Sequence, residues 1–186
     1  MCWVMNKDCC KDMLPHCYFR YLMQAQQIIE QLQLLPHPEG GYYKETYRGA
    51  QMVAGREGKP RNVSTAIYYM LENDDKSHFH RIHSDELWFF HQGEAFEIVA
   101  IIDGKVVTFN LGNNMANGEV PQVVIPAHTW FASRVKSGKG FALASCTVAP
   151  GFDFADFEMA VREALIGEYP YLEEVITTFT KPTTAQ

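Results

Sequence analysis

The feature that most constrains the fold is a series of short apolar segments between residues 62 and 149. Several are rich in β-branched and aromatic residues, which are typical of strands, and turn-forming residues separate them. Asp103 and Gly104 stand between two apolar runs, and this dipeptide is a strong indication of a β-hairpin. The series therefore predicts an all-β-dominated domain, either a β-sandwich or a small barrel.

Helical spacing of apolar residues occurs only toward the two ends of this series. Residues 24–35 place isoleucine and leucine at intervals of three and four, before a Pro- and Gly-rich stretch. Residues 152–170 carry a second helical pattern that includes Phe157 and Leu165 and ends before Gly167. With 186 residues, we expect a single domain over residues 23–186, flanked by helices, and a loose extension over residues 1–22.

Charge and composition exclude several classes of partner. The formal net charge of −6 argues against a general nucleic-acid binder, because such proteins neutralise phosphates with excess Lys and Arg. No apolar run approaches the roughly 20 residues that span a bilayer, so we expect no membrane partner. Five cysteines, an odd number, favour reduced thiols and a cytoplasmic location.

The most polar part of the strand region is the stretch "SHFHRIHSDELWFFHQG", residues 77–93. Because strand side chains alternate between faces, an extended chain would place His78, His80 and Glu86 on one face with Trp88. Trp88 favours burial, so we expect Glu86 to point inward toward an apolar cavity. Loss of solvation would then raise its pKa, unless a cation or hydrogen bonds compensate.

The spacing His78-x-His80-x5-Glu86-x6-Gly93 resembles the first motif of the cupin superfamily. Two imidazoles and one carboxylate also match a common iron ligand set, so His78, His80 and Glu86 are the candidate ligands if Fe, Zn or Ni is bound. The second cupin motif normally supplies a further histidine, but Phe131 stands at that position. Phenylalanine cannot ligate a metal, so we expect no metal cofactor and keep the metal site as the alternative.

Several separated segments resemble one cupin subgroup, the Cupin_5 type, a domain of unknown function. They are "LLPHPEGGYYKETYR", "STAIYYML", "SHFHRIHSDELWFF", "IPAHTWFAS" and "TVAPGFDFADFEMA". The resemblance extends from about residue 26 to residue 171. It implies a double-stranded β-helix, the jelly-roll barrel of cupins, with a small-molecule ligand inside and pairing as a homodimer.

A weaker similarity suggests a chemistry. The stretch "EGGYYKETYR" is similar to the opening segment of dTDP-4-dehydrorhamnose epimerases, which are metal-free cupins, with Glu39, Tyr43 and Glu45 at matching positions. In that family a barrel histidine is the base and a tyrosine the acid. The similarity implies His80 as the base, since histidine exchanges protons near neutral pH.

The remaining catalytic roles stay open between neighbours. Asp85 or Glu86 would orient His80 or provide its counter-charge, and Tyr43 or Tyr68 would be the proton donor.

Other candidate ligand-binding residues each have a structural alternative. Arg61 and Arg81 could hold a carboxylate or phosphate, or form structural ion pairs. Trp88 and Trp130 could stack on a ligand ring or fill the core. His37, between two prolines, could line the site or only bind the turn.

Three functions remain compatible with these residues. The first is a metal-independent binder of a small polar metabolite of the sugar or nucleotide-sugar type, with epimerase- or isomerase-like proton transfer. The second is a metal-dependent dioxygenase or isomerase that uses the ligand set above. The third is a non-catalytic metabolite-binding module.

Overall fold

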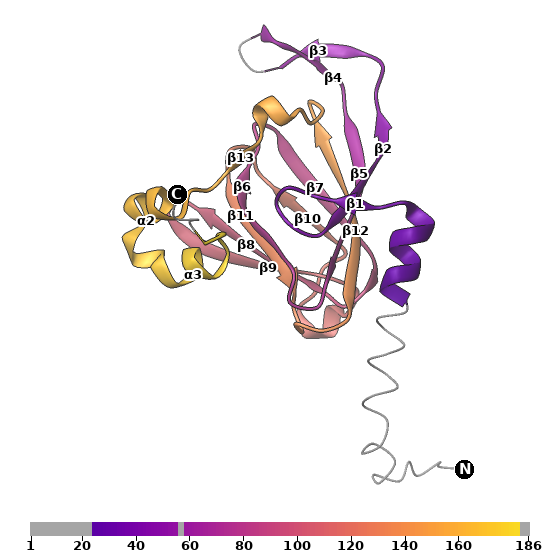
Figure 1. Cartoon of the computed structure of the whole chain (residues 1–186). Helices are drawn as coiled ribbons and strands as arrows, with labels where there is room; N and C mark the ends of the chain where they lie inside the picture. Colours follow the sequence, from indigo (N-terminus) through magenta and orange to yellow (C-terminus); the bar gives the residue numbers. More distant parts are fainter. Residues whose placement is uncertain (1–23, 56–57, 183–186) are drawn as a thin grey trace, which may run out of the picture.

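The computed structural model describes residues 24–55 and 58–182, so the predicted extension over residues 1–22 lies outside the described residues. Two antiparallel sheets face each other and enclose the main hydrophobic core (Figure 1). The predicted all-β domain with helices on both flanks is confirmed.

The larger sheet has six strands in the order β1-β2-β5-β12-β7-β10. These strands are β1 (Leu35–Pro36), β2 (Tyr42–Arg48), β5 (Thr65–Glu72), β12 (Phe141–Ala149), β7 (Asp85–Gly93) and β10 (Gln122–Ile125). The second sheet has five strands in the order β13-β6-β11-β8-β9. They are β13 (Glu158–Met159), β6 (Lys76–Arg81), β11 (Trp130–Val135), β8 (Phe96–Ile102) and β9 (Lys105–Leu111). Consecutive strands such as β6 and β7 lie in different sheets, as in a jelly roll.

The predicted hairpin is confirmed at β8 and β9. Ile102 pairs with Lys105, and both turn residues have positive φ, 50° at Asp103 and 69° at Gly104. A two-residue turn of this kind matches the right-handed twist of the strands that it joins.

The space between the two sheets is filled by aromatic and aliphatic side chains. Trp88 is 1% exposed, and its ring centroid lies 5.4 Å from that of Tyr69, 5.6 Å from Phe96 and 6.3 Å from Phe131. These contacts close one half of the barrel, and the other half contains a cavity.

Short helices cover the outer faces of both sheets. The helix at residues 24–32 packs on Met70, Phe141 and Leu143 of the six-stranded sheet. The helices α2 (Arg162–Glu168) and α3 (Glu173–Thr178) cover the five-stranded sheet on its other side (Figure 1). The 3₁₀ turns are η3 (Met115–Asn117), η4 (Phe154–Asp156) and η5 (Pro170–Leu172).

The expected helix over residues 152–170 is partly wrong. The chain forms η4, then adds strand β13 to β6, and becomes helical only at Arg162. Phe157 therefore ends η4 with an extended backbone and does not continue a helix, and its ring points into the barrel. The apolar spacing was compatible with a helix, but pairing of Glu158 and Met159 with β6 prevails.

A two-stranded arm projects beyond the barrel (Figure 1). It consists of β3 (Met52–Ala54) and β4 (Pro60–Asn62).

Among the described residues, the structure contains no helix that is long and apolar enough to cross a membrane.

Candidate functional site

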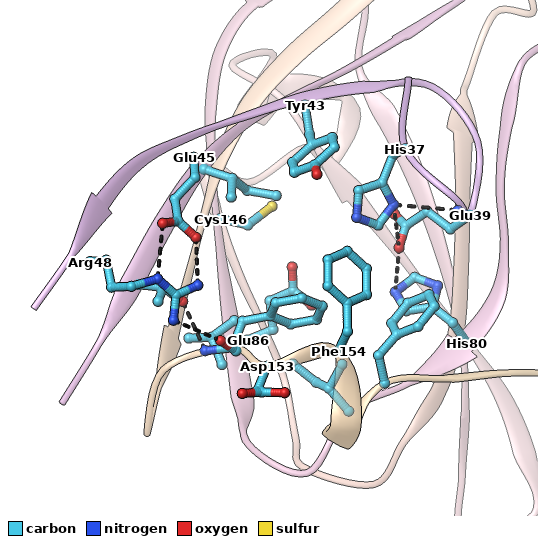
Figure 2. Close-up of a pocket in the computed structure, with 16 residues that line it drawn as sticks. His37, Glu39, Tyr43, Glu45, Arg48, His80, Glu86, Cys146, Asp153 and Phe154 are labelled. Atoms are coloured by element: carbon cyan, nitrogen blue, oxygen red, sulfur yellow. Dashed lines mark hydrogen bonds and ion pairs between the residues drawn. The ribbon is translucent and has the colours of Figure 1, made fainter. Parts of the chain in front are cut away.

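A cavity of about 380 Å³ opens into the barrel between the two sheets, and we call it the barrel cavity (Figure 2). Strands β2, β5, β6, β7 and β12 line it, together with the turn before β2 and the segment at 152–157. Its lining residues are His37, Glu39, Tyr43, Glu45, Arg48, Thr65, Ile67, His80, Ile82, Glu86, Cys146, Val148, Phe152, Asp153, Phe154 and Phe157.

The turn at residues 37–41 carries a carboxylate into the barrel. The amide of Gly40 donates to the carbonyl of His37, and Gly40 has a φ of 119°. A Cβ at Gly40 would lie 2.0 Å from the carbonyl oxygen of Lys76, so only glycine allows this close approach to β6. The approach places Glu39 against β6, where the residue is buried and only 4% exposed.

Glu39 lies between two imidazoles, and we call this group the His37–Glu39–His80 cluster (Figure 2). Its Oε2 atom is 3.3 Å from Nδ1 of His37 and 3.2 Å from Nε2 of His80. Its Oε1 atom accepts a hydrogen bond of 2.9 Å from the Ser77 hydroxyl. A buried carboxylate group of this kind requires such partners to be tolerated.

Geometry fixes the tautomer of His80. Its Nδ1 lies 2.8 Å from the carbonyl oxygen of His78, and a carbonyl only accepts, so Nδ1 carries a proton. In the neutral ring Nε2 is then an acceptor, and its contact with Glu39 needs one proton between the two atoms. The pair consequently holds one shared, exchangeable proton, either on the carboxyl or on the ring.

Burial places that proton on the carboxyl. Burial lowers the pKa of His80 to about 4, and the hydrogen bond to the His78 carbonyl offsets this only in part. Burial also raises the pKa of Glu39, although His37 and the Ser77 hydroxyl act in the opposite direction. Both shifts favour the proton on the carboxyl over a second proton on the ring.

Glu86 forms a second buried acid in the same cavity. It is 7% exposed, and burial raises its pKa to about 8, with the neighbouring carboxyl of Glu39 as a further cause. A hydrogen bond with the thiol of Cys146 acts in the opposite direction. The expectation that Glu86 points inward with a raised pKa is confirmed.

The 152–157 segment, which the sequence pattern predicted as the beginning of a helix, forms one wall of the cavity. Phe152, Phe154 and Phe157 contact one another in edge arrangements, with ring centroids 5.0–6.0 Å apart. Asp153 caps η4 by accepting from the Ala155 amide. The repeated Phe-Asp pattern was the available signal. The residues that follow pair with β6, and the three rings line the cavity, with Phe154 still 53% exposed.

Arg61 fastens this wall to the projecting arm. Its Nε and Nη2 donate to the two carboxylate oxygens of Asp156 at 2.6 and 2.9 Å. His83 Nδ1 lies 3.4 Å from the same carboxylate, and the hydrogen bond from Arg61 is the largest cause of the lowered pKa of Asp156. A bidentate pair of this kind fixes orientation as well as distance.

Replacing Asp156 by Asn should loosen the wall without unfolding the barrel. The bidentate ion pair is lost, so we expect amide hydrogen exchange of residues 152–157 to rise by about tenfold or more, as for a local opening. Exchange in the β8–β9 hairpin serves as the internal control. Equal acceleration in both regions would contradict a local role for the pair.

The structure brings six of the predicted site residues to the barrel cavity. They are His37, Glu39, Tyr43, Glu45, His80 and Glu86. The partner of His80 differs from the expectation, because Glu39 contacts it, whereas Asp85 accepts a hydrogen bond from the Ala127 amide outside the cavity. The sequence analysis expected Asp85 or Glu86 to orient His80. The carboxylate that contacts His80 comes instead from the turn at residues 37–41, which is far from both in the sequence.

The other predicted residues lie away from the barrel cavity. Arg81 pairs with Glu158 and stacks over Trp130, 4.3 Å from its ring centroid, on the helix-covered side. Tyr68 packs near the N-terminal helix, and Arg61 is engaged as described above. Trp88 fills the core. Their ligand-binding roles stay predictions that this placement does not favour.

His78 does not share the inward face with His80, contrary to the simple alternation. In the register of β6 against β11, His80 faces Phe131 and Ser77 faces Ser133, so β6 has one extra residue between these pairs. A bulge of this kind reverses the alternation. Nδ1 of His78 instead donates to the carbonyl oxygen of Glu39 at 2.6 Å.

The three side chains of the alternative ligand set do not converge on one point in this structure. His78 is turned away, the acceptor nitrogen of His80 faces Glu39, and Glu86 bonds the thiol of Cys146. Across the described ranges, no cluster of three or more His, Cys, Asp or Glu side chains is arranged to hold a metal ion.

Comparison with protein families decides the family. Residues 26–160 match the family described as Cupin_5, cupin superfamily (DUF985). The chain belongs to this family. The Cupin_5 resemblance inferred from the motifs is thereby confirmed, whereas the similarity to dehydrorhamnose epimerases is not.

Relatives of this Cupin_5 protein share much of its length. It is 37% identical over 145 residues to the uncharacterized protein YML079W of Saccharomyces cerevisiae, covering 70% of this chain and 72% of the yeast protein. A hypothetical protein from Leishmania major has a solved structure with a TM-score of 0.81 and 35% identity, covering 85% of this chain and 99% of that chain. A Shewanella oneidensis protein has a TM-score of 0.78 and 37% identity, over 85% and 98% of the two chains.

A more distant likeness concerns the fold alone. Oxalate decarboxylase from Bacillus subtilis aligns with a TM-score of 0.50 at 12% identity, over 81% of this chain and 38% of that chain. The cupin jelly-roll barrel expected from the sequence is thus confirmed by both the topology and these neighbours.

Proposed function

We propose that this Cupin_5 protein binds a small polar metabolite of the sugar type in the barrel cavity and exchanges a proton with it. The observation that carries this proposal is Oε2 of Glu39, which lies within hydrogen-bonding reach of two ring nitrogens. A carboxyl poised between two imidazoles can give up a proton and recover it with little rearrangement, which is the requirement for general acid–base catalysis.

Two proton-carrying groups on different walls support an epimerase- or isomerase-like reaction. Glu39, supported by His80, removes a proton from a carbon next to a carbonyl once its own proton has passed to the ring. Glu86, which is uncharged near neutral pH, returns a proton from its own wall. Tyr43 also lines the cavity and is the alternative donor.

Solvent exchange in the bound metabolite tests the proposal. A screen of free sugars and sugar nucleotides for thermal stabilisation supplies ligands. In D₂O, proton NMR should then show loss of one carbon-bound hydrogen of a ligand. Glu39→Gln and His80→Ala should each slow this exchange by about 100-fold or more.

The matched control is Glu173→Gln, an exposed carboxylate on α3 that lies outside the cavity. Exchange that survives in both Glu39→Gln and His80→Ala would contradict the catalytic role of the cluster. Tight binding with an unchanged ligand would favour the non-catalytic binding module. Stoichiometric iron, zinc or nickel in untagged protein, together with loss of exchange on chelation, would favour the metal-dependent alternative.

We also propose that the chain pairs as a homodimer. Support comes from the outer face of β7 and β10, where half-buried Leu87 and Phe89 lie beside Val124, which is 45% exposed. Sedimentation of the full chain should give twice the monomer mass, and Phe89→Glu should shift it to the monomer. A monomer at all concentrations would contradict the proposal.

A further inference from the structure

The ionisable groups that line the barrel cavity are mostly carboxyls. Four carboxyl groups reach it, from Glu39, Glu45, Glu86 and Asp153, whereas Arg48 provides its one guanidinium among the described residues. The two imidazoles do not compensate, because burial lowers the pKa of both His37 and His80. An anionic ligand would therefore enter a site without a free counter-charge.

Arg48 has little capacity left for a ligand. Its Nε and Nη2 donate to the two oxygens of Glu45 at 2.9 and 2.6 Å. Its Nη1 donates to Asn62 Oδ1 and to the carbonyl oxygen of Phe152. Four of the five guanidinium N–H groups are thus engaged, and both carboxylate oxygens of Glu45 neutralise its charge.

Glu86 is the carboxyl that lacks a charged partner. It is more than nine-tenths buried and lines the cavity beside the weakly polar thiol of Cys146, which offsets its raised pKa only in part. Within residues 24–55 and 58–182, no Lys, Arg or His forms an ion pair with it. A buried acid in this position is stabilised most by a cation that a ligand brings.

Aromatic rings form the rest of the wall. Tyr43 lies edge-on to His37 at 4.6 Å between ring centroids, and the rings of Phe154 and Phe157 lie 6.4 and 6.0 Å from the same imidazole. Aromatic faces attract ammonium groups, and the attraction increases when water is excluded. Asp153, at the mouth, adds a partly exposed carboxylate on the route into the cavity.

We infer that the barrel cavity selects a ligand that carries an ammonium group, with Glu86 as its counter-ion. The bound cation favours the ionised carboxylate of Glu86, so in this complex Tyr43, the alternative donor, returns the proton. This inference rests on the proposed function, because it assigns a chemical class to the ligand of the same cavity. Amino sugars and other small hydroxylated amines fit this class, whereas sugar nucleotides and sugar acids do not. The charge of the ligand therefore distinguishes amines from anionic sugars, two classes that the cupin resemblance alone does not distinguish.

Matched probes that differ only in charge test the selection. One set is glucosamine, glucose and glucuronate, and the second is benzylamine, benzyl alcohol and benzoate. Calorimetry at pH 7 and millimolar probe should show each amine binding tighter than its alcohol by at least about tenfold, which is about 1.4 kcal/mol. The carboxylate of each set should bind most weakly.

Two variants assign the preference to Glu86. Glu86→Gln keeps the shape and removes the ionisable group, so the amine should lose its advantage over the alcohol. Glu173→Gln should keep the full preference. Tighter binding of either carboxylate, no binding of any amine, or an unchanged preference in Glu86→Gln would each overturn the inference.

The two sets also keep this inference separate from the proposed function. If benzylamine shows the Glu86-dependent preference while neither uncharged nor amino sugar binds, the charge selection holds and the sugar class of the proposed function fails. If glucose binds with solvent exchange at carbon but without any advantage for glucosamine, the proposed function holds and the ammonium site fails.

Discussion

Replacing Glu86 by Gln is expected to stabilise the fold by about 3 to 5 kcal/mol at pH 9. Glutamine has nearly the same shape as the protonated glutamate but never ionises. The native carboxyl, by contrast, must lose its proton in a buried site that holds its pKa at about 8. The cost of the buried charge disappears in the variant.

The direction of the pH dependence follows from the raised pKa. In the unfolded chain the carboxyl ionises near its ordinary value of 4.5, so between that pH and about 8 the unfolded state binds fewer protons than the folded one. The contribution of protonated Glu86 to the free energy of unfolding is fully present below pH 4.5 and is lost as the pH rises through about 8. Urea unfolding between pH 5 and 9 should show this loss in the wild type and not in the variant.

Glu173→Gln is again the control, and its curve should follow that of the wild type. A Glu86→Gln curve parallel to the wild type across the whole range would show that Glu86 is charged in the folded state at neutral pH. That outcome would place a cation beside it and contradict its description as a buried neutral acid.

Trp88→Ala is expected to destabilise the barrel by about 3 to 5 kcal/mol. The indole is 1% exposed and contacts Tyr69 of its own sheet and Phe96 and Phe131 of the facing sheet, so its removal leaves a large cavity between them. Chemical denaturation measured by fluorescence or circular dichroism gives the value. A loss below about 1 kcal/mol would mean that the indole is not a core residue.

The matched variant Trp88→Phe separates core packing from ligand binding. The indole nitrogen of Trp88 has no hydrogen-bond partner among the described residues, so removal of this donor offsets part of the lost volume. We expect a loss below about 2 kcal/mol and unchanged affinity for cavity ligands. A marked loss of affinity at unchanged stability would instead support the ligand-binding role predicted from the sequence.

The sequence predicted the strands, the hairpin turn and the flanking helices because each depends on local patterns. Asp103 and Gly104 adopt the positive φ values that their residue types favour. The helix expected over residues 152–170 shows where local spacing fails, since pairing of β13 with a strand nearly 80 positions earlier determines that segment.

The part of the site that depends on local strand alternation was predicted, and the part that depends on long-range contacts was not. Alternation in β7 correctly turned Glu86 inward, because that half of the strand pairs regularly with β12 and β10. Alternation in β6 failed at His78, where a bulge against β11 adds a residue that no sequence signal marked. The pairing of Glu39 with His80 depends on a contact across 41 positions, which a motif with fixed spacing does not contain.

The protonation state of the His37–Glu39–His80 cluster tests the central claim most directly. Protein with ¹⁵N-labelled histidine allows the two ring nitrogens of His80 to be followed by NMR from pH 8 to pH 5. A neutral ring with its proton on Nδ1 throughout this range is the predicted result, because its pKa is about 4 and Nδ1 donates to the carbonyl oxygen of His78. A doubly protonated ring at neutral pH, or titration near 6.5, would contradict the neutral acid–base cluster on which the proposed function depends.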